Sequence, residues 1–192
     1  MLEGLLNTKL KKRVLAIFFA FPKRSFTTSE LRQTAGASER LVNAVVKELL
    51  RAEVLALTYR KRSRLLRVNS RFPLYQELDD LVGKEFGGEL DAVSKLLKKL
   101  PNAKLIILTG MFSFQPHLPT DILIVGRQIG KIRLQNLLAE IEKLTDQEVC
   151  YTLMDDNEYE YRRMMNDRFV RDILDNSHVV VLNTFRSKKI KI

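Results

Sequence analysis

The sequence predicts an α+β protein of two domains, on three observations. Apolar residues recur at helical spacing over the first fifty positions, strand-like alternation around a basic tip follows, and strands alternate with helices from position 103 onward. A chain of 192 residues, 45% of them hydrophobic, suits two small domains with a buried core each. We expect these domains at 1–72 and 102–192, joined by a helical segment at 73–101.

Composition and the N-terminus indicate a cytoplasmic protein without membrane contact. No stretch reaches the ~18 apolar residues of a membrane span. The segment "KLKKRVLAIFFAF" starts like a signal peptide, but "PKRS" follows it with no small-residue cleavage site. Its apolar residues also have helical spacing, which predicts a buried amphipathic helix. Cys150 is the only cysteine, which rules out an internal disulfide and a cysteine zinc cluster.

Charge is unevenly distributed along the chain. Residues 1–75 hold 16 of the 33 Lys and Arg but only five of the 23 Asp and Glu, and therefore carry +11. The remaining residues carry −1, within a net charge of +10. A basic half joined to a neutral half indicates a polyanionic partner for the first half alone.

Two short helices follow the first one. "FTTSELRQTAG" predicts a helix capped by Thr27 or Thr28 and ended by Gly36. "ASERLVNAVVKELLRAEVL" predicts a second, from an N-cap at Ser38 to about Ala52. Two short helices joined by a tight turn describe a helix-turn-helix, whose second helix enters the DNA major groove.

The second of these helices has two distinct faces. One is an apolar stripe, which consists of Val42, Val45, Val46 and Leu49. The opposite face is expected to be exposed and consists of Glu39, Arg40, Asn43, Ala44 and Lys47. We expect the second face to meet the partner.

"VLALTYRKRSRLLRVN" predicts a β-hairpin with a basic tip. Its apolar residues alternate along both strands, while "RKRSR" lies between them. So much positive charge at one tip repels itself unless it neutralises phosphates, and such binding weakens steeply with salt. The residues expected to do so are Arg60, Lys61, Arg62 and Arg64.

A helix, a helix-turn-helix and a basic hairpin in this order resemble the winged-helix domain of ArsR-like transcription regulators, over residues 5–72. The resemblance implies double-stranded DNA as partner, with Arg40, Asn43 and Lys47 at base edges or phosphates and the hairpin arginines on the backbone. Glu53 departs from the family, which commonly has a glycine there to end the recognition helix. Winged helices also serve as protein-interaction modules.

The segment after the hairpin predicts two helices that build a homodimer contact, as is common in such regulators. The first helix starts at Pro73, and Gly87 and Gly88 allow a bend before the second, which Pro101 ends.

From position 103 the predicted order is strand 104–108, glycine turn, strand 121–125, helix 132–144, strand 148–153, helix 157–174 and strand 179–182. "LIILTG", "TDILIVG" and "VCYTLMDDNEYEYRRMMNDRFVRDILDNSHVVVLN" resemble the minimal nucleotidyltransferase fold. The expected fold is thus a winged helix-turn-helix followed by a small nucleotidyltransferase-like mixed-sheet domain.

The residues that would make such a domain catalytic are altered. Active members hold phosphate with Gly-Ser at a helix start and Mg²⁺ with two acids at alternate strand positions, plus a third on a neighbouring strand. Here Gly110 is followed by Met111, the paired acidic positions are Pro119 and Asp121, and Glu148 is the only acid near the third. One carboxylate cannot organise two divalent cations. We expect a catalytically inactive domain without cofactor, in which Gly110 and Asp121 are the remnant of a nucleotide pocket.

Three functions stay open at this point. The favoured one is a DNA-binding regulator whose second domain serves dimerisation or senses a nucleotide or small-molecule effector. The alternatives are an active nucleotidyltransferase acting on a protein or small molecule, and an antitoxin-like interaction module. His117 and His178 lack partners at metal spacing, so no metal site is expected. The acidic cluster at 155–160 is expected to stabilise a helix start.

Overall fold

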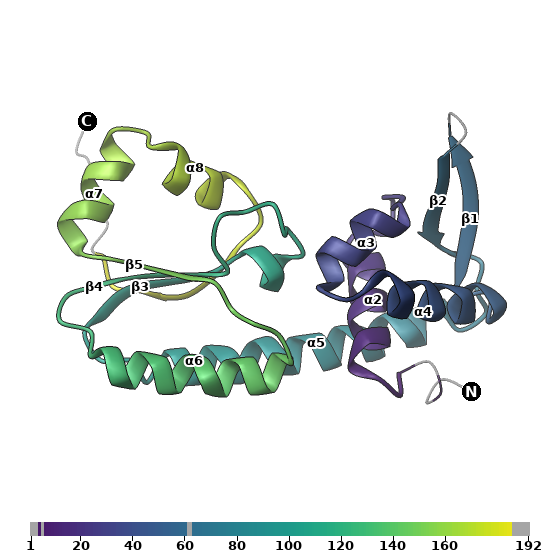
Figure 1. Cartoon of the computed structure of the whole chain (residues 1–192), viewed down its shortest axis with the longest axis horizontal. Coiled ribbons are helices and arrows are strands. Elements are labelled where there is room, and N and C mark those ends of the chain that lie inside the picture. The colour runs from purple at the N-terminus through teal and green to yellow at the C-terminus, as the bar shows by residue number, and fades with distance from the viewer. Residues whose placement is uncertain (1–3, 5, 61–62, 186–192) are drawn as a thin grey trace. The chain divides into compact units, whose positions relative to one another are not determined.

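The described residues of the computed structural model form a mixed α/β protein with two sheets and two compact units, Met1–Glu89 and Leu90–Ile192 (Figure 1). Residue 4, residues 6–60 and residues 63–185 are described. The predicted linker segment 73–101 is divided between the units, because the boundary falls inside one helix. No helix in the described part of the chain is long and apolar enough to cross a membrane.

The first unit consists of three helices, a two-stranded hairpin and the first part of a long fourth helix. The elements are α2 (Lys9–Ala20), α3 (Thr28–Ala35), α4 (Glu39–Arg51), β1 (Leu55–Arg60), β2 (Ser63–Val68) and the first part of α5 (Tyr75–Leu97). Most residues of the predicted inward stripes are buried, and Val14, Phe18, Leu31, Val42 and Leu49 have almost no exposed surface. Leu10 and Phe21, at the ends of the first stripe, are only partly buried. Phe18 also packs edge-on against Phe26, with ring centroids 5.3 Å apart. These apolar contacts orient α4.

Helix α4 ends at a left-handed residue although that residue is not glycine. Glu53 has φ 59°, and the N–H groups of Glu53 and Val54 donate to the carbonyls of Leu50 and Leu49 at 3.1 and 3.0 Å. This is the bond pair of a Schellman motif, which normally has glycine at the left-handed position. The Asn69 side-chain amide donates to the Glu53 carbonyl at 2.7 Å and holds the conformation.

Helix α5 corrects the expectation of two helices. It runs without interruption through Gly87 and Gly88, and neither glycine has a positive φ. It begins at Tyr75, two residues after the predicted start at Pro73. Glycine permits a bend but does not impose one, and the apolar positions on both sides of the pair keep a common helical spacing.

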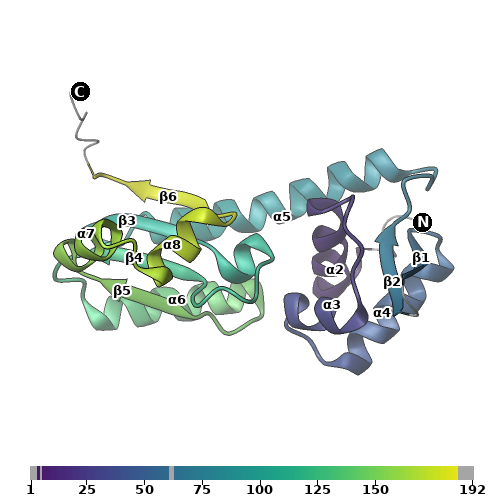
Figure 2. The same cartoon turned by 90° about the horizontal axis from the view of Figure 1, so that it is seen from above.

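The second unit is a four-stranded sheet covered on both faces. Its elements are β3 (Ala103–Leu108), the 3₁₀ turn η1 (Gly110–Ser113), β4 (Ile122–Gly126), α6 (Lys131–Thr145), β5 (Tyr151–Met154), α7 (Asp156–Met164), α8 (Arg168–Asp175) and β6 (Val179–Asn183). The strand order is β5-β4-β3-β6, so β5 and β6 form the edges (Figure 2). Strand β3 is antiparallel to both neighbours, and β4 and β5 are parallel.

Alternate residues of the central strands enter two cores. Ile106 and Leu108 pack with α6 and residues 90–97 of α5, while Leu105 and Ile107 pack with α7 and α8. Figure 1 shows α6 on one face of the sheet and α7 and α8 on the other. Strands covered on both faces are continuously apolar, which explains the runs "LIIL" and "ILIV".

The single helix predicted at 157–174 is wrong, because α7 and α8 are separate. Asn166 has φ 52° between them, and Asp167 caps α8 by accepting a 3.4 Å hydrogen bond from the Val170 N–H. Asn tolerates the left-handed region and Asp is a favoured N-cap. The dipeptide Asn-Asp therefore ends one helix and starts the next. Strand β5 also starts later than the predicted position 148.

Candidate nucleic-acid interface

Helix α4 presents the polar face that the sequence predicts. Arg40, Asn43 and Lys47 are exposed, while Val42 and Val46 on the opposite side are buried. Residues spaced by three and four share one side of a helix. The three polar side chains consequently form a single stripe that is free of the core.

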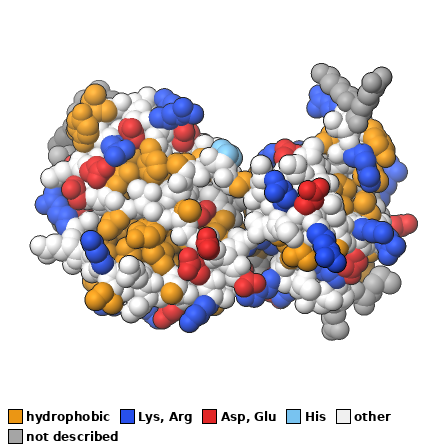
Figure 3. All heavy atoms as spheres, viewed as in Figure 1, with side chains coloured by type: hydrophobic (Ala, Val, Ile, Leu, Met, Phe, Trp, Pro, Cys, Tyr) orange, Lys and Arg blue, Asp and Glu red, His pale blue; other side chains and the backbone are white. Residues whose placement is uncertain are grey.

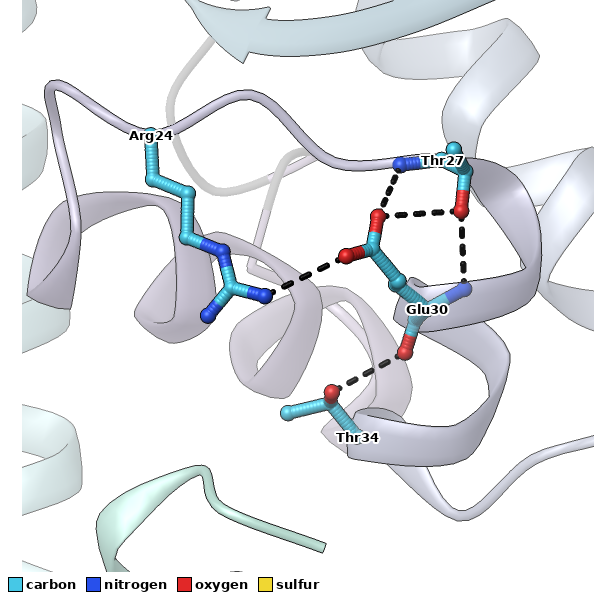
Figure 4. A network of polar contacts seen from close by, with 4 residues as sticks. All are labelled: Arg24, Thr27, Glu30 and Thr34. Atoms are coloured by element: carbon cyan, nitrogen blue, oxygen red, sulfur yellow. Dashed lines mark hydrogen bonds and ion pairs between the residues drawn. The ribbon is translucent and has the colours of Figure 1, made fainter. Parts of the chain in front are cut away.

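The start of α3, the helix that precedes α4, is fixed by a capping box (Figure 4). The Glu30 N–H donates to the Thr27 hydroxyl at 3.1 Å, and the Thr27 N–H donates back to Glu30 Oε2 at 2.7 Å. Arg24 Nη2 donates to Glu30 Oε1 at 3.2 Å, and the Thr34 hydroxyl donates to the Glu30 carbonyl. Of the two predicted caps, Thr27 is the one used.

The pKa of Glu30 reflects this network. Partial burial acts to raise the pKa, but the hydrogen bonds from Thr27 and Arg24 together outweigh it, and the pKa lies below its ordinary value of 4.5. The carboxylate is thus held in its charged form. Gly36 then ends α3 with φ 61°, as predicted, and Ser38 occupies the N-cap of α4 without a side-chain capping bond.

The β1–β2 hairpin divides its basic residues between two faces. Tyr59 pairs with Arg64 and Leu57 pairs with Leu66 across the strands, so these four side chains share one face. Arg60 pairs with Ser63 and lies on the other face. Lys61 and Arg62, the other two residues of the predicted basic tip, lie outside the described residues.

A groove of about 530 Å³ runs between α4 and the hairpin face that carries Arg64. It brings together three of the predicted site residues, Asn43, Lys47 and Arg64, from two separate elements. We call it the α4–hairpin groove, and its lining consists of Thr28, Asn43, Val46, Lys47, Leu50, Arg51, Leu57, Arg64 and Leu66. The lining does not include Ser38, Arg40 or Arg60.

Two polar lining residues, Thr28 and Arg51, are absent from the predicted site, as are the four apolar ones. The sequence could have indicated Arg51, because it lies four positions after Lys47 and continues the polar stripe of α4. Thr28 reaches the groove from α3, and no spacing in the sequence relates α3 to the hairpin. The isolated bridge between Phe26 and Leu66 is what brings these segments together.

The groove is positively charged. Among the ion pairs of the described residues, none involves Lys47, Arg51 or Arg64. Glu48, the neighbour of Lys47, is instead bonded to Lys11 of α2 at 2.5 Å. In Figure 3, Lys and Arg side chains recur over the visible face of the unit that contains α2, α3 and α4.

The second predicted site, around Gly110 and Asp121, is a structural clamp. Asp121 Oδ1 accepts the Met111 N–H at 2.7 Å, and Oδ2 accepts the Cys150 N–H at 2.9 Å. Gly110 has φ 50°, and a Cβ added there would overlap Asp121 Oδ1. Both carboxylate oxygens therefore bind backbone donors and tie η1 to the residue before β5.

The acidic cluster at 155–160 is also engaged by protein groups. Asp155 caps α7 by accepting the Glu158 N–H at 2.8 Å. Asp156 is buried and paired with Lys104 and Arg127. In the part of the chain that the structure describes, no three His, Cys, Asp or Glu side chains are grouped to hold a metal ion.

Comparison of the chain with known protein families, curated proteins and solved structures gives no match.

Proposed function

We propose that the first unit is a winged helix-turn-helix domain that binds double-stranded DNA with sequence preference, and that the protein is a transcriptional regulator. The observation that carries the proposal is the α4–hairpin groove, where Asn43, Lys47 and Arg64 converge. Its cations have no ion-pair partner among the described residues, which leaves them available for phosphates. The excess of +11 over residues 1–75 favours the same partner.

In this proposal α4 lies in the major groove, which is wide enough for a helix. Asn43 and Arg40 reach base edges, since an Asn amide pairs with adenine and an Arg guanidinium with guanine. Lys47, Arg51 and Arg64 neutralise phosphates on one side of the helix, and the Ser38 hydroxyl reaches another near its start. Arg60, Lys61 and Arg62 contact the backbone from the hairpin tip.

The test is a salt series of duplex binding by fluorescence anisotropy with the full chain. We expect log K to fall linearly with log salt, because each neutralised phosphate releases counterions. A Lys47→Gln/Arg64→Gln variant should reduce the slope by about two, one for each lost phosphate contact. The matched control is Lys84→Gln/Lys98→Gln, which removes the same charge from exposed positions outside the groove.

Equal slopes for both double variants would overturn the assignment of the groove. A complete lack of duplex binding at low salt would overturn DNA binding itself and favour the interaction-module alternative.

For the second unit we propose a non-catalytic role in dimerisation or in binding a nucleotide or small effector. The support comes from the hydrogen bonds of Asp121 and from the residues at two altered positions. Both carboxylate oxygens of Asp121 already accept backbone N–H groups. Met111 and Pro119 stand where active nucleotidyltransferases have a serine and a second acid. Incubation with Mg²⁺ and labelled nucleoside triphosphates tests this role. Transfer of label that Asp121→Asn abolishes would overturn it.

A further inference from the structure

Phosphate binding does not account for the apolar part of the α4–hairpin groove. Its floor and walls include four apolar side chains, Val46, Leu50, Leu57 and Leu66. A nucleic-acid backbone needs cations and hydrogen-bond donors, and inorganic anions need the same. Neither fills an apolar floor.

Leu57 is the clearest sign of an unfilled site. Its strand neighbour Leu55 and its cross-strand partner Leu66 are each 3% exposed, whereas Leu57 is 40% exposed at the wall of the groove. Tyr59, next on the same face, is 68% exposed. Apolar surface in a concavity gains free energy when a ligand removes it from water.

Cations border this apolar surface on both sides. Lys47 and Arg51 come from α4, and Arg64 comes from β2. Thr28 and Asn43 add uncharged hydrogen-bonding groups. The groove, of about 530 Å³, thus combines four apolar side chains with five polar ones. Small-molecule sites likewise combine apolar surface with convergent polar groups.

We propose that the α4–hairpin groove binds an amphipathic carboxylate, with the apolar ring or chain on Leu50 and Leu57 and the carboxylate on Arg64 and Lys47. A guanidinium binds a carboxylate through two parallel hydrogen bonds. The ligand occupies the residues assigned to phosphates, so ligand and DNA exclude each other. This exclusion rests on the proposed DNA binding, whereas binding of the carboxylate does not.

The experiment uses 2-naphthoate as probe and the ¹⁵N-labelled full chain, followed by NMR. Two matched compounds separate the parts of the claim: neutral 2-naphthamide keeps the ring, and inorganic phosphate keeps the charge. We expect saturable shifts centred on the amides of α4 and the hairpin with 2-naphthoate. Affinity should be about tenfold lower for 2-naphthamide, because a charge-assisted hydrogen bond is lost.

Two pairs of variants locate the site. Leu57→Ser and Arg64→Gln should each weaken 2-naphthoate binding about tenfold. Leu41→Ser and Arg67→Gln are the controls, since Leu41 is 55% exposed on α4 and Arg67 lies on the other hairpin face, and neither lines the groove. Their affinity should equal that of the unchanged protein.

Four results would overturn the proposal. They are the absence of saturation, shifts centred outside the groove, equal affinity for the acid and the amide, and equal losses in the test and control variants. A competition arm then adds a fluorescent duplex. Displacement of the duplex by 2-naphthoate, but not by phosphate at equal ionic strength, supports exclusion, and a ternary complex contradicts it. If 2-naphthoate binds and no duplex does, the proposed function fails while the carboxylate site stands.

Discussion

Lys11 of α2 and Glu48 of α4 are joined by a 2.5 Å ion pair in which the lysine side chain is 7% exposed and the glutamate 52%. The Lys11 ammonium also donates to the Gly4 carbonyl at 3.0 Å. The pair therefore fixes α4 to α2 and neutralises Glu48, the acid next to Lys47 in the sequence. It links the stability of the unit to the charge of its exposed surface.

This pair predicts an asymmetric effect of removing the acid. Glu48→Gln leaves a buried ammonium without its anionic partner and should lower the free energy of unfolding by about 1–3 kcal/mol. Glu85→Gln is the control, because Glu85 pairs with Lys12 between two partly exposed side chains, 35% and 50%. Its effect should stay below about 1 kcal/mol. Urea denaturation measures both, and equal effects would contradict the role given to Lys11.

Glu53 offers the opposite change, a gain in stability. A left-handed conformation costs a non-glycine residue about 1–2 kcal/mol, part of which glycine loses again through its greater unfolded-state entropy. Glu53→Gly should therefore raise the free energy of unfolding by about 0.5–1 kcal/mol. Glu53→Ala keeps the strain and should give no gain. A lower stability of Glu53→Gly in thermal denaturation would show that α4 does not end in this way.

The capping box at Thr27 predicts a pH-dependent effect. Because the pKa of Glu30 is lower in the folded protein than its ordinary value of 4.5, its contribution is present above pH 4.5 and is lost as pH falls through the folded value. Thr27→Ala removes one hydrogen bond to this carboxylate and the cap itself, and should cost about 1 kcal/mol at neutral pH.

The cost of Thr27→Ala should become smaller as pH falls through the lowered folded pKa of Glu30, because the carboxyl is then protonated in the folded and the unfolded state. Denaturation at pH 7 and pH 3 measures it. An equal cost at pH 7 and pH 3 would show that the Thr27 cap stabilises α3 independently of the charge on Glu30.

The Asp121 clamp predicts loss of stability from a nearly isosteric change. Asn provides one carbonyl oxygen in place of two acceptors, so Asp121→Asn leaves the N–H of Met111 or Cys150 without its partner. The expected cost is about 1–3 kcal/mol. Glu148→Gln, at an exposed position near the same loop, is the control. A fully stable Asp121→Asn protein would indicate that the carboxylate is free to serve a ligand.

Local patterns in the sequence predicted the first unit well. The cap at Thr27 or Thr28, Gly36 and the buried stripe of α4 each depend on residues within one or two helical turns of each other. The structure confirms the last two and selects Thr27 as the cap. The break at Asn166 was equally local, and the sequence "MNDR" could have indicated it. The prediction missed this break because apolar spacing continues across it.

Other features depend on contacts between distant residues. Asp121 binds the N–H of Cys150, 29 positions later, and this choice of partner has no signature in the spacing of either segment. The groove similarly required α3, α4 and the hairpin to meet, so Thr28 and the apolar floor were not predicted. The left-handed Glu53 was unexpected because its stabilising partner, Asn69, comes 16 residues later.

The most direct test of sequence-preferring DNA binding is selection of bound fragments from a random duplex library, with the unchanged protein and Asn43→Ala compared. The account predicts that the unchanged protein enriches a defined motif. It further predicts that Asn43→Ala loses preference at one position, about 1–3 kcal/mol of discrimination, while retaining most of its affinity for duplex. Two results would contradict the assignment of α4 as the recognition helix. One is a library that stays random with the unchanged protein, and the other is a motif that Asn43→Ala reproduces in full.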